Sequence, residues 1–366
     1  MVQLWNEIRS NPLLWLLPLV PIVLVADHLR PEARTLLFVL CVLAIVPLAA
    51  VLSRATEAVA GRTGDAVGGL LNATLGNLTE LMIAFTALRA GEYLLVKASV
   101  AGAIVANTLF MLGASLLLGG LRHHTQQFNA AGARLQAAQL FLATIALLVP
   151  STVPDPQSGA DGPGFLNDLS LVLALVLLAT YALGLVFSLK THREFFGAKS
   201  GHAEAVGEPW PLGLAVATLG GVTVLIALVS EIFVASLEAA AGTLGLTDAF
   251  VGFVVVALVG GAAEIASAVS AARKDRLDLS IGIALGSATQ IALFVAPVLV
   301  LASYTVGPSP MTLQFWPGAV VMMMLAALTA TLVGGTGRSA WFTGVLVLAV
   351  YATFAVSLYL IPPHLP

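Results

Sequence analysis

Two glutamates stand inside long apolar stretches of the chain, among glycines and other small residues. Glu80 ends the motif "GNLTE" and Glu264 ends the motif "GGAAE". A charged side chain at the centre of a membrane helix costs roughly 2.5–3.5 kcal/mol on insertion scales measured for aspartate, and glutamate should behave similarly. Such a carboxylate must therefore be neutralised by a cation or a proton. The glycines that open the motifs, Gly76 and Gly260, allow close helix approach and expose backbone carbonyl oxygens.

The two motifs belong to an internal repeat with a constant offset of 184 residues. The matching positions are Gly76/Gly260, Glu80/Glu264, Arg89/Arg273, Gly102/Gly286 and Phe110/Phe294. Self-similarity at a fixed offset indicates that one structural unit is used twice. A buried glutamate can serve only as a helix–helix hydrogen-bonding group, but matching carboxylates in both repeats favour a functional pair.

Further polar side chains accompany the two glutamates. Spacing of i, i+4 and i+8 predicts that Asn72, Gly76 and Glu80 form one stripe along a helix. The additional candidate ligands are Asn77 in the first motif, Asn107 on the following helix, and Ser287 and Gln290 on the helix after the second motif. Together these groups would supply carboxylate, amide, hydroxyl and carbonyl oxygens. A purely structural role remains an alternative for Asn107, Ser287 and Gln290 taken singly.

The donor set predicts a hard cation. All six histidines fall in loops or at chain ends, and the single cysteine, Cys41, is far from both motifs in the sequence. Oxygen ligands suit Ca²⁺, whereas zinc and copper prefer imidazole or thiolate. Two carboxylates match the charge of a divalent ion, and protons would compete with that ion for the same oxygens.

Three more carboxylates could line the path to this site. They are Glu57 in "ATEAVAG" and the pair Glu231 and Glu238 in "SEIFVASLEAAAG". For Glu57 and Glu238 a solvated helix end is an equally good interpretation, whereas Glu231 stands further inside its apolar stretch.

Composition requires a membrane protein to position these groups. The chain has 366 residues, of which 59% are hydrophobic and 10% charged, against about 25% charged residues in soluble proteins. Eleven apolar stretches are long enough to cross a hydrocarbon core of roughly 30 Å. They lie near 12–27, 34–53, 64–88, 95–120, 131–150, 166–189, 211–236, 247–272, 278–303, 312–334 and 340–362. We therefore predict an all-α polytopic membrane protein with 11 transmembrane helices. The absence of period-two alternation excludes a β-barrel, and the lack of a basic patch excludes nucleic acid as a partner.

Orientation and domain organisation follow from charge and from the repeat. With a cytoplasmic N-terminus, twelve lysines and arginines fall in cytoplasmic segments and four in external ones, which satisfies the positive-inside rule and places the C-terminus outside. We expect a first transmembrane helix in 1–33, a five-helix repeat in 34–190, a cytoplasmic linker at 191–210 and a second five-helix repeat in 211–366. Counting spans gives the two repeats opposite topology, as in many secondary transporters.

The motif sequences resemble those of a known family. "GGLLNATLGNLTELMIAF" (68–85) and "GGAAEIASAVSAARKDRLDLSIGIALGSATQIALFVAP" (260–297) are similar to the two signature regions of the Ca²⁺/cation–proton exchangers (the CAX family) of the cation/Ca²⁺ exchanger superfamily. The resemblance implies the exchanger fold, with 11 helices arranged 1+5+5. It also implies cation binding by Glu80 and Glu264, assisted by Asn77, Ser287 and Gln290, and access-path roles for Glu57 and Glu231.

Two positions depart from that family. Its second motif usually reads Gly-Asn-Ala-Ala-Glu-His, whereas this chain has Gly261 in place of the asparagine and Ile265 in place of the histidine. One amide and one titratable group are therefore missing.

These observations predict an antiporter that exports cytosolic Ca²⁺ in exchange for H⁺, rather than an enzyme. The alternatives are a Na⁺/Ca²⁺ exchanger of the same superfamily, a cation channel and a non-transporting scaffold. No cofactor is expected, because Ca²⁺ and H⁺ are the transported substrates. A prokaryotic plasma membrane is the expected location, and the sequence leaves open whether the chain forms a homo-oligomer.

Overall fold

The structure is a computed structural model that describes residues 12–63, 65–153, 163–191 and 210–360. Most of the linker predicted at 191–210 therefore lies outside the described residues. Within the described part, nine helices are long and apolar enough to cross a membrane, or ten if one bent pair counts as a single span. The fold is thus a mostly helical membrane bundle, as the composition predicts.

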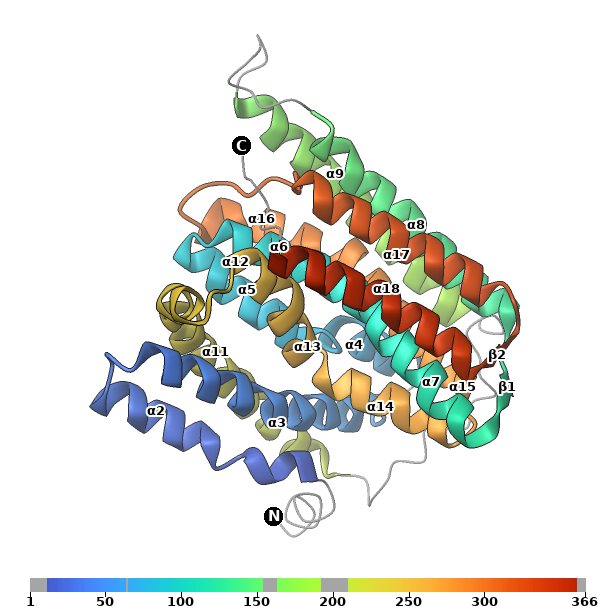
Figure 1. Cartoon of the computed structure of the whole chain (residues 1–366), viewed down its shortest axis with the longest axis horizontal. Helices are drawn as coiled ribbons and strands as arrows, with labels where there is room; N and C mark the ends of the chain where they lie inside the picture. The colour runs from blue at the N-terminus through green and yellow to red at the C-terminus, as the bar shows by residue number, and fades with distance from the viewer. Residues whose placement is uncertain (1–11, 64, 154–162, 192–209, 361–366) are drawn as a thin grey trace.

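Figure 1 shows how the helices are arranged. The first half contains η1 (Pro12–Leu16), α2 (Leu19–Leu29), α3 (Arg34–Ala60), α4 (Asp65–Leu75), α5 (Leu78–Ala90), α6 (Tyr93–Val105), η2 (Ala106–Met111), α7 (Leu112–His123), α8 (Ala130–Ser151), α9 (Pro163–Val186) and η4 (Phe187–Thr191). The second half contains α11 (Leu212–Leu244), α12 (Asp248–Phe250), η5 (Val251–Val256), α13 (Ala257–Gly260), α14 (Ala262–Arg273), α15 (Leu277–Gln290), η6 (Ile291–Val295), α16 (Ala296–Val306), α17 (Pro317–Gly334) and α18 (Trp341–Leu360).

The repeat of the sequence is also a repeat of element boundaries. α3 and α11 end at Ala60 and Leu244, and α5 and α14 begin at Leu78 and Ala262. α6 and α15, and likewise α7 and α16, also begin 184 residues apart. Each long helix of the α6–α7 and α15–α16 pairs contains a π-helical turn, η2 or η6, at matching places. The matching positions of the sequence repeat therefore correspond to matching local structure.

Three layers are visible in Figure 1. α2, α3 and α11 form one side, and α3 and α11 lie along each other with stacked rings of Phe38 and Phe233, whose centroids are 5.1 Å apart. α8, α9 and α17 form the opposite side. The motif helices lie between these layers, where the buried apolar core is continuous. This placement removes both glutamates from the lipid-facing surface.

Two short strands join the halves at one end of the bundle. β1 (Thr125–Gln127) follows α7, and β2 (Arg338–Ala340) connects α17 to α18. They pair antiparallel, with Thr125 opposite Ala340. Gln126 also donates to the carbonyl of Ala272, near the end of α14, at 2.9 Å. We call this the ribbon end of the molecule, and the other the far end.

The two motif helices are broken rather than continuous. α4 ends at Leu75 and α5 begins at Leu78, while α13 and α14 are separated by Gly261 and bend by 57°. The predicted stripe of Asn72, Gly76 and Glu80 along one helix is therefore wrong. Asn77 and Gly261 occupy the N-cap positions of the second segments, and both residue types are among those common at N-caps.

Glycine is required where the halves cross most closely. α6 packs against η5, and a Cβ added at Gly102 would overlap the backbone of Phe253. On the facing helix, a Cβ at Gly252 would lie 2.7 Å from Cβ of Ala98. Small residues at such crossings allow backbones to approach, which is how helices associate in lipid.

This crossing generates a stability prediction. Gly102→Leu should lower the melting temperature of the detergent-solubilised protein or abolish its monodisperse peak, because overpacking costs about 1–3 kcal/mol or more. Gly220→Leu is the matched control, since nothing lies within 4 Å of a Cβ at Gly220. An unchanged melting temperature for Gly102→Leu would contradict the close crossing.

Candidate functional site

Each central glutamate occupies the third position of a helix that begins inside the bundle. Glu80 lies in the first turn of α5 and Glu264 in the first turn of α14. The N-terminus of a helix carries partial positive charge, which favours a carboxylate in the first turn. The helix breaks therefore provide each acid with a local electrostatic partner inside the bundle.

The acid of each half lies against the glycines of the other half. A Cβ added at Gly260 would be 3.0 Å from Cγ of Glu80, and one added at Gly76 would be 3.7 Å from Oε1 of Glu264. The two motifs therefore lie against each other reciprocally, and the missing side chain of Gly260 leaves room for Glu80.

A network of side chains ties the first motif to the helix after the second. Nδ2 of Asn77 donates to Oε1 of Gln290 at 2.7 Å, and Oγ of Ser287 donates to Oδ1 of Asn77 at 2.7 Å. Nδ2 of Asn107 donates to Oγ of Ser287 at 2.8 Å. All four predicted polar residues are therefore brought together, with Asn77, Asn107 and Ser287 buried.

Two oxygens of this cluster have no hydrogen-bond donor from the protein. They are Oδ1 of Asn107 and Oε2 of Glu264, both of which are buried. Buried acceptors are normally satisfied, so each is available to a ligand. Among the described residues no three histidine, cysteine or acidic side chains form a metal-binding group. Among these residues, protein ligands beyond the two carboxylates would therefore be amide, hydroxyl or carbonyl oxygens.

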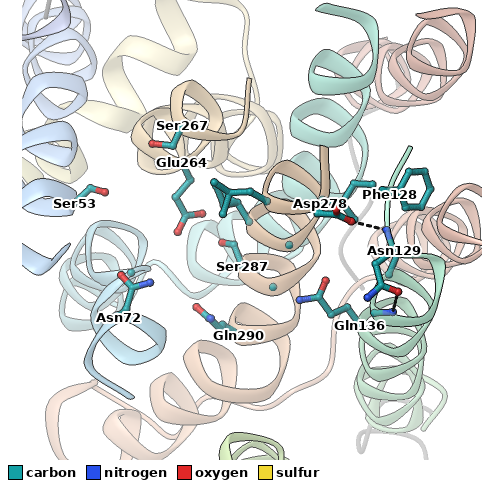
Figure 2. A pocket seen from close by; sticks show the side chains of 18 of the residues that line it. Ser53, Asn72, Phe128, Asn129, Gln136, Glu264, Ser267, Asp278, Ser287 and Gln290 are labelled. Carbon is teal, nitrogen blue, oxygen red and sulfur yellow. Dashed lines mark hydrogen bonds between the residues drawn. The ribbon is translucent and has the colours of Figure 1, made fainter. Parts of the chain in front are cut away.

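A cavity of about 330 Å³ reaches the site from the ribbon end. Figure 2 shows the carboxylate of Glu264 pointing toward the space between Asn72, Ser287 and Gln290. Glu57 of α3 lines the same cavity, where it pairs with Arg54 at 3.3 Å. The structure thus places this access-path candidate on a cavity that contains a central carboxylate.

Sequence reasoning missed part of the lining of this cavity. Ser53, Gln136, Ser267 and Asp278 also contribute to it. Ser267 stands one turn after Glu264, a spacing that could have been noticed. Asp278 lies in the first turn of α15, where its carboxylate accepts a hydrogen bond from the backbone N–H of Asn129. Gln136 comes from α8, and only the tertiary fold brings it here.

A second cavity, of about 600 Å³, opens at the far end. Its acidic lining residues are Glu92, Glu231, Glu238 and Asp248. Burial, followed by the negative charges of Asp248 and Glu238, raises the pKa of Glu92 above its usual value. Neither central glutamate lines this cavity, so Glu231 and Glu238 do not share a space with the site.

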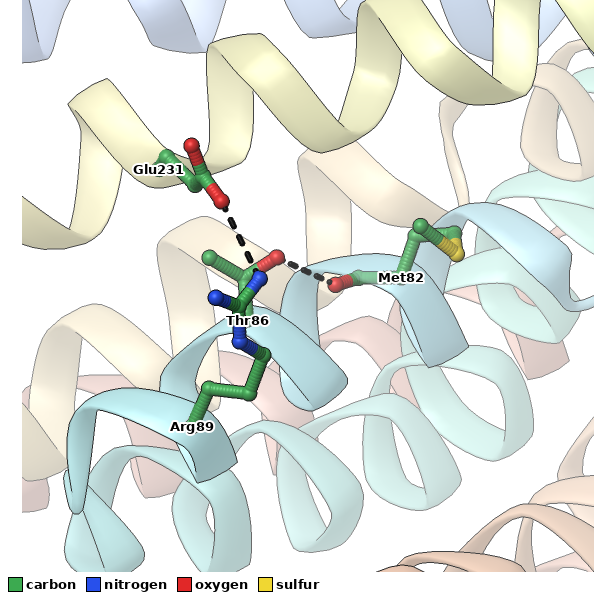
Figure 3. Close-up of polar contacts among 4 residues, drawn as sticks. All are labelled: Met82, Thr86, Arg89 and Glu231. Carbon is green, nitrogen blue, oxygen red and sulfur yellow. Dashed lines mark hydrogen bonds and ion pairs between the residues drawn. The ribbon is translucent and has the colours of Figure 1, made fainter. Parts of the chain in front are cut away.

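Glu231 does not lie buried in its span. Its side chain is 53% exposed and pairs with Arg89, at the end of α5, at 3.2 Å. Figure 3 shows this pair bridging α11 and α5. The ion pair therefore links the helix that carries Glu80 to the α3–α11 layer at the far end.

The chain is similar to known proteins along most of its length. The family model described as "Sodium/calcium exchanger protein" matches residues 34–190 and again 214–360. A "Ca(2+)/H(+) antiporter" of Synechocystis sp. is 40% identical over 352 residues, covering 92% of this chain and 94% of that protein. A protein of the same name from Aphanothece halophytica is 40% identical over 360 residues, covering 95% of this chain and 96% of its own.

A solved structure is similar along the whole chain. The crystal structure of the Ca²⁺/H⁺ antiporter protein YfkE superimposes with a TM-score of 0.81 at 32% identity, covering 96% of this chain and 100% of that one. The family match spans both halves, and each match contains one broken motif helix. The chain therefore belongs to the sodium/calcium exchanger protein family, within its cation–proton exchanger (CAX) branch.

Proposed function

We propose that the chain is a secondary active antiporter that exports cytosolic Ca²⁺ in exchange for H⁺. The observation that carries this proposal is the reciprocal placement of Glu80 and Glu264 at two helix breaks inside the bundle. Among the described residues no lysine or arginine forms an ion pair with either glutamate. The relatives named Ca(2+)/H(+) antiporter support the same pair of substrates.

The exchange follows from the competition for these oxygens. Ca²⁺ takes six to eight oxygen ligands, and Glu80 and Glu264, whose Oε2 has no protein donor, supply ligands from both halves. Protons bind the same carboxylates and displace the ion. The unoccupied, doubly charged site is too costly to carry through the apolar interior, so transport in each direction requires one of the two substrates.

Access alternates between the two cavities. The cavity at the ribbon end contains Glu264, whereas the cavity at the far end contains neither central glutamate. This conformation is open toward the ribbon end, where Arg122, Arg273, Lys274, Arg276 and Arg338 lie close to β1 and β2. The positive-inside rule makes that end cytoplasmic, so the N-terminus is cytoplasmic and the C-terminus external. Glu57 lies on the inner path, and Glu231 and Glu238 on the outer one.

Spatial neighbours support eleven crossings. Glu57, near the end of α3, and Asn129, just after β1, line one cavity, so the chain returns to the same end between them. It does so through α6–α7, which spans the membrane, and α4–α5, which must then span it once as well. The same reasoning applies to the second half. Trp210, before α11, packs beside Val59, and Arg273, at the end of α14, is contacted through its carbonyl by His123. Both ends therefore lie on the ribbon side, so α11 crosses outward and α12–α14 crosses back once.

Eleven crossings give the 1+5+5 layout. α2 is a separate first span, and each half then contributes five spans. The spans of one half run in the opposite direction to their equivalents in the other, with Glu80 on the third span and Glu264 on the eighth. The domains are 1–33, 34–190, the linker 191–210 and 211–366. The two family matches, at 34–190 and 214–360, support this division. Inverted repeats that meet at broken helices are typical of secondary transporters.

The central experiment is Ca²⁺ transport in proteoliposomes without sodium, driven by an imposed pH gradient. Wild-type protein should accumulate Ca²⁺, and Glu80→Gln and Glu264→Gln should each lower the rate by roughly a hundred-fold, because loss of one buried charged ligand costs about 3 kcal/mol. Glu32→Gln, an exposed loop substitution, is the control. Transport that requires sodium would favour Na⁺/Ca²⁺ exchange, and flux that neither saturates nor depends on the pH gradient would favour a channel.

Accessibility tests the orientation. In a Cys41→Ala background, Ser267→Cys should react with a membrane-impermeant cationic thiol reagent added from the cytoplasmic side, and Ala235→Cys from the external side. Both residues are exposed and line opposite cavities. Saturating Ca²⁺ should slow the reaction at Ser267→Cys. Reaction of both cysteines from one side would refute the proposed topology.

The ion pair at the far end generates another prediction. Arg89→Gln should increase labelling of Ala235→Cys by up to about five-fold, since a half-exposed pair contributes at most about 1 kcal/mol toward holding α5 against α11. The charge exchange Arg89→Glu with Glu231→Arg should restore the wild-type rate. Glu238→Gln removes an acid from the same cavity without breaking the pair, so an equal effect there would contradict the role of the pair.

A further inference from the structure

The two halves differ at one position beside the central site. Asn77 and Gly261 are equivalent in the repeat, since each is the N-cap residue three positions before a central glutamate. Their backbones are also alike, with φ −96° and ψ 26° at Asn77 against φ −79° and ψ 3° at Gly261. A side chain is compatible with this conformation, so the backbone does not impose glycine at 261.

The side chain of Asn77 reaches from the first half to the second. Its Oδ1 accepts from Ser287 and its Nδ2 donates to Gln290, both at 2.7 Å. Gly261 of the second half offers no such group to the first. The polar contacts around the site are therefore asymmetric, even though the helices that bear them are equivalent.

The space beside Gly261 faces oxygen acceptors. A Cβ placed there would lie 3.4 Å from Oδ1 of Asn107, 3.6 Å from Oε1 of Glu80 and 3.2 Å from the carbonyl oxygen of Ala257. Oδ1 of Asn107 receives no hydrogen bond, although the residue is only 1% exposed. The carbonyl of Ala257 already accepts from the backbone N–H of Gly261 at 3.1 Å, which leaves the two side-chain acceptors, Oδ1 of Asn107 and Oε1 of Glu80. This pair is complementary to a hydrogen-bond donor that can also offer an oxygen to a cation.

We propose that the space beside Gly261 holds a water molecule that belongs to the cation site. The water donates its hydrogens to Oδ1 of Asn107 and to Glu80, and its oxygen completes the coordination of the bound divalent cation. Buried waters of this kind need a polar site with two to four partners, which these acceptors and the ion supply. The inference rests on the proposed function and adds one ligand to it. That ligand is a water, for which Gly261 leaves room because it has no side chain.

Two substitutions that add the same Cβ separate the polar requirement from the steric one. Gly261→Ala fills the space with an apolar methyl group, whereas Gly261→Asn fills it and returns a polar group to the position. Replacing a bridging water by a group that cannot reproduce its hydrogen bonds loses affinity. We expect Gly261→Ala to weaken Ca²⁺ binding about ten-fold, the equivalent of one net hydrogen bond. Gly261→Asn should bind within about three-fold of wild type, or more tightly.

The measurement is calorimetric titration of purified protein in detergent with Ca²⁺, together with thermal unfolding of each variant. Gly261→Ala binding as tightly as wild type would overturn the inference, because no polar occupant would be needed. Equal weakening by alanine and asparagine would also overturn it, since only the added Cβ would matter. If neither variant folds, the space is too small for a methyl group and hence for the water. Absence of Ca²⁺ binding by wild type would instead refute the proposed function.

Discussion

An apolar membrane interior penalises every charge and every unpaired backbone group, and this constraint shapes the centre of the molecule. Two helices are interrupted there, at Gly76–Asn77 and at Gly261. Each interruption exposes helix ends that would be costly in lipid. The chain uses these ends, because the positive end of each new helix lies under a glutamate in its own first turn. Helix breaks and carboxylates thus compensate each other, and neither would be stable there alone.

The central glutamate of each half packs against a glycine of the other half. Glu80 occupies the room beside Gly260, and Glu264 the room beside Gly76. A side chain at Gly260 would press on Glu80, whereas one at Gly76 would first meet the carbonyl oxygen of Asn72, at 2.7 Å from its Cβ. The polar network adds a second link, since Asn77 of the first half bonds to Ser287 and Gln290 of the second. The site therefore exists only when both halves are in register, which couples cation binding to the relative position of the two repeats.

Much of this organisation could be predicted from the sequence, because its signals were strong and local. Long apolar stretches identify the spans, and the constant offset between "GNLTE" and "GGAAE" identifies the paired motifs. The grouping of Asn107, Ser287 and Gln290 with the motifs also followed from helical spacing, and the hydrogen bonds among them agree with it.

Other features depended on tertiary structure. The predicted stripe through Asn72 and Glu80 assumed a continuous helix, and a glycine in a helix does not reveal whether the helix continues or breaks. Glu231 lies well inside its apolar stretch in the sequence. In the structure it is exposed to the far-end cavity and forms an ion pair with Arg89. Gln136 joins the inner cavity from a helix that carries no motif. For Glu231 and Gln136 the missing information was which helices face each other.

The pairing of β1 with β2 has a mechanical consequence. It fastens the loop after α7 to the loop between α17 and α18, and Gln126 extends the fastening to the last turn of α14. Loops from both repeats are thus stapled together at a single end. Moving these segments far apart would break backbone hydrogen bonds, so this end of the molecule is held fixed. The α3–α11 layer contributes no strand to the β1–β2 pair and is therefore the part that is freest to move.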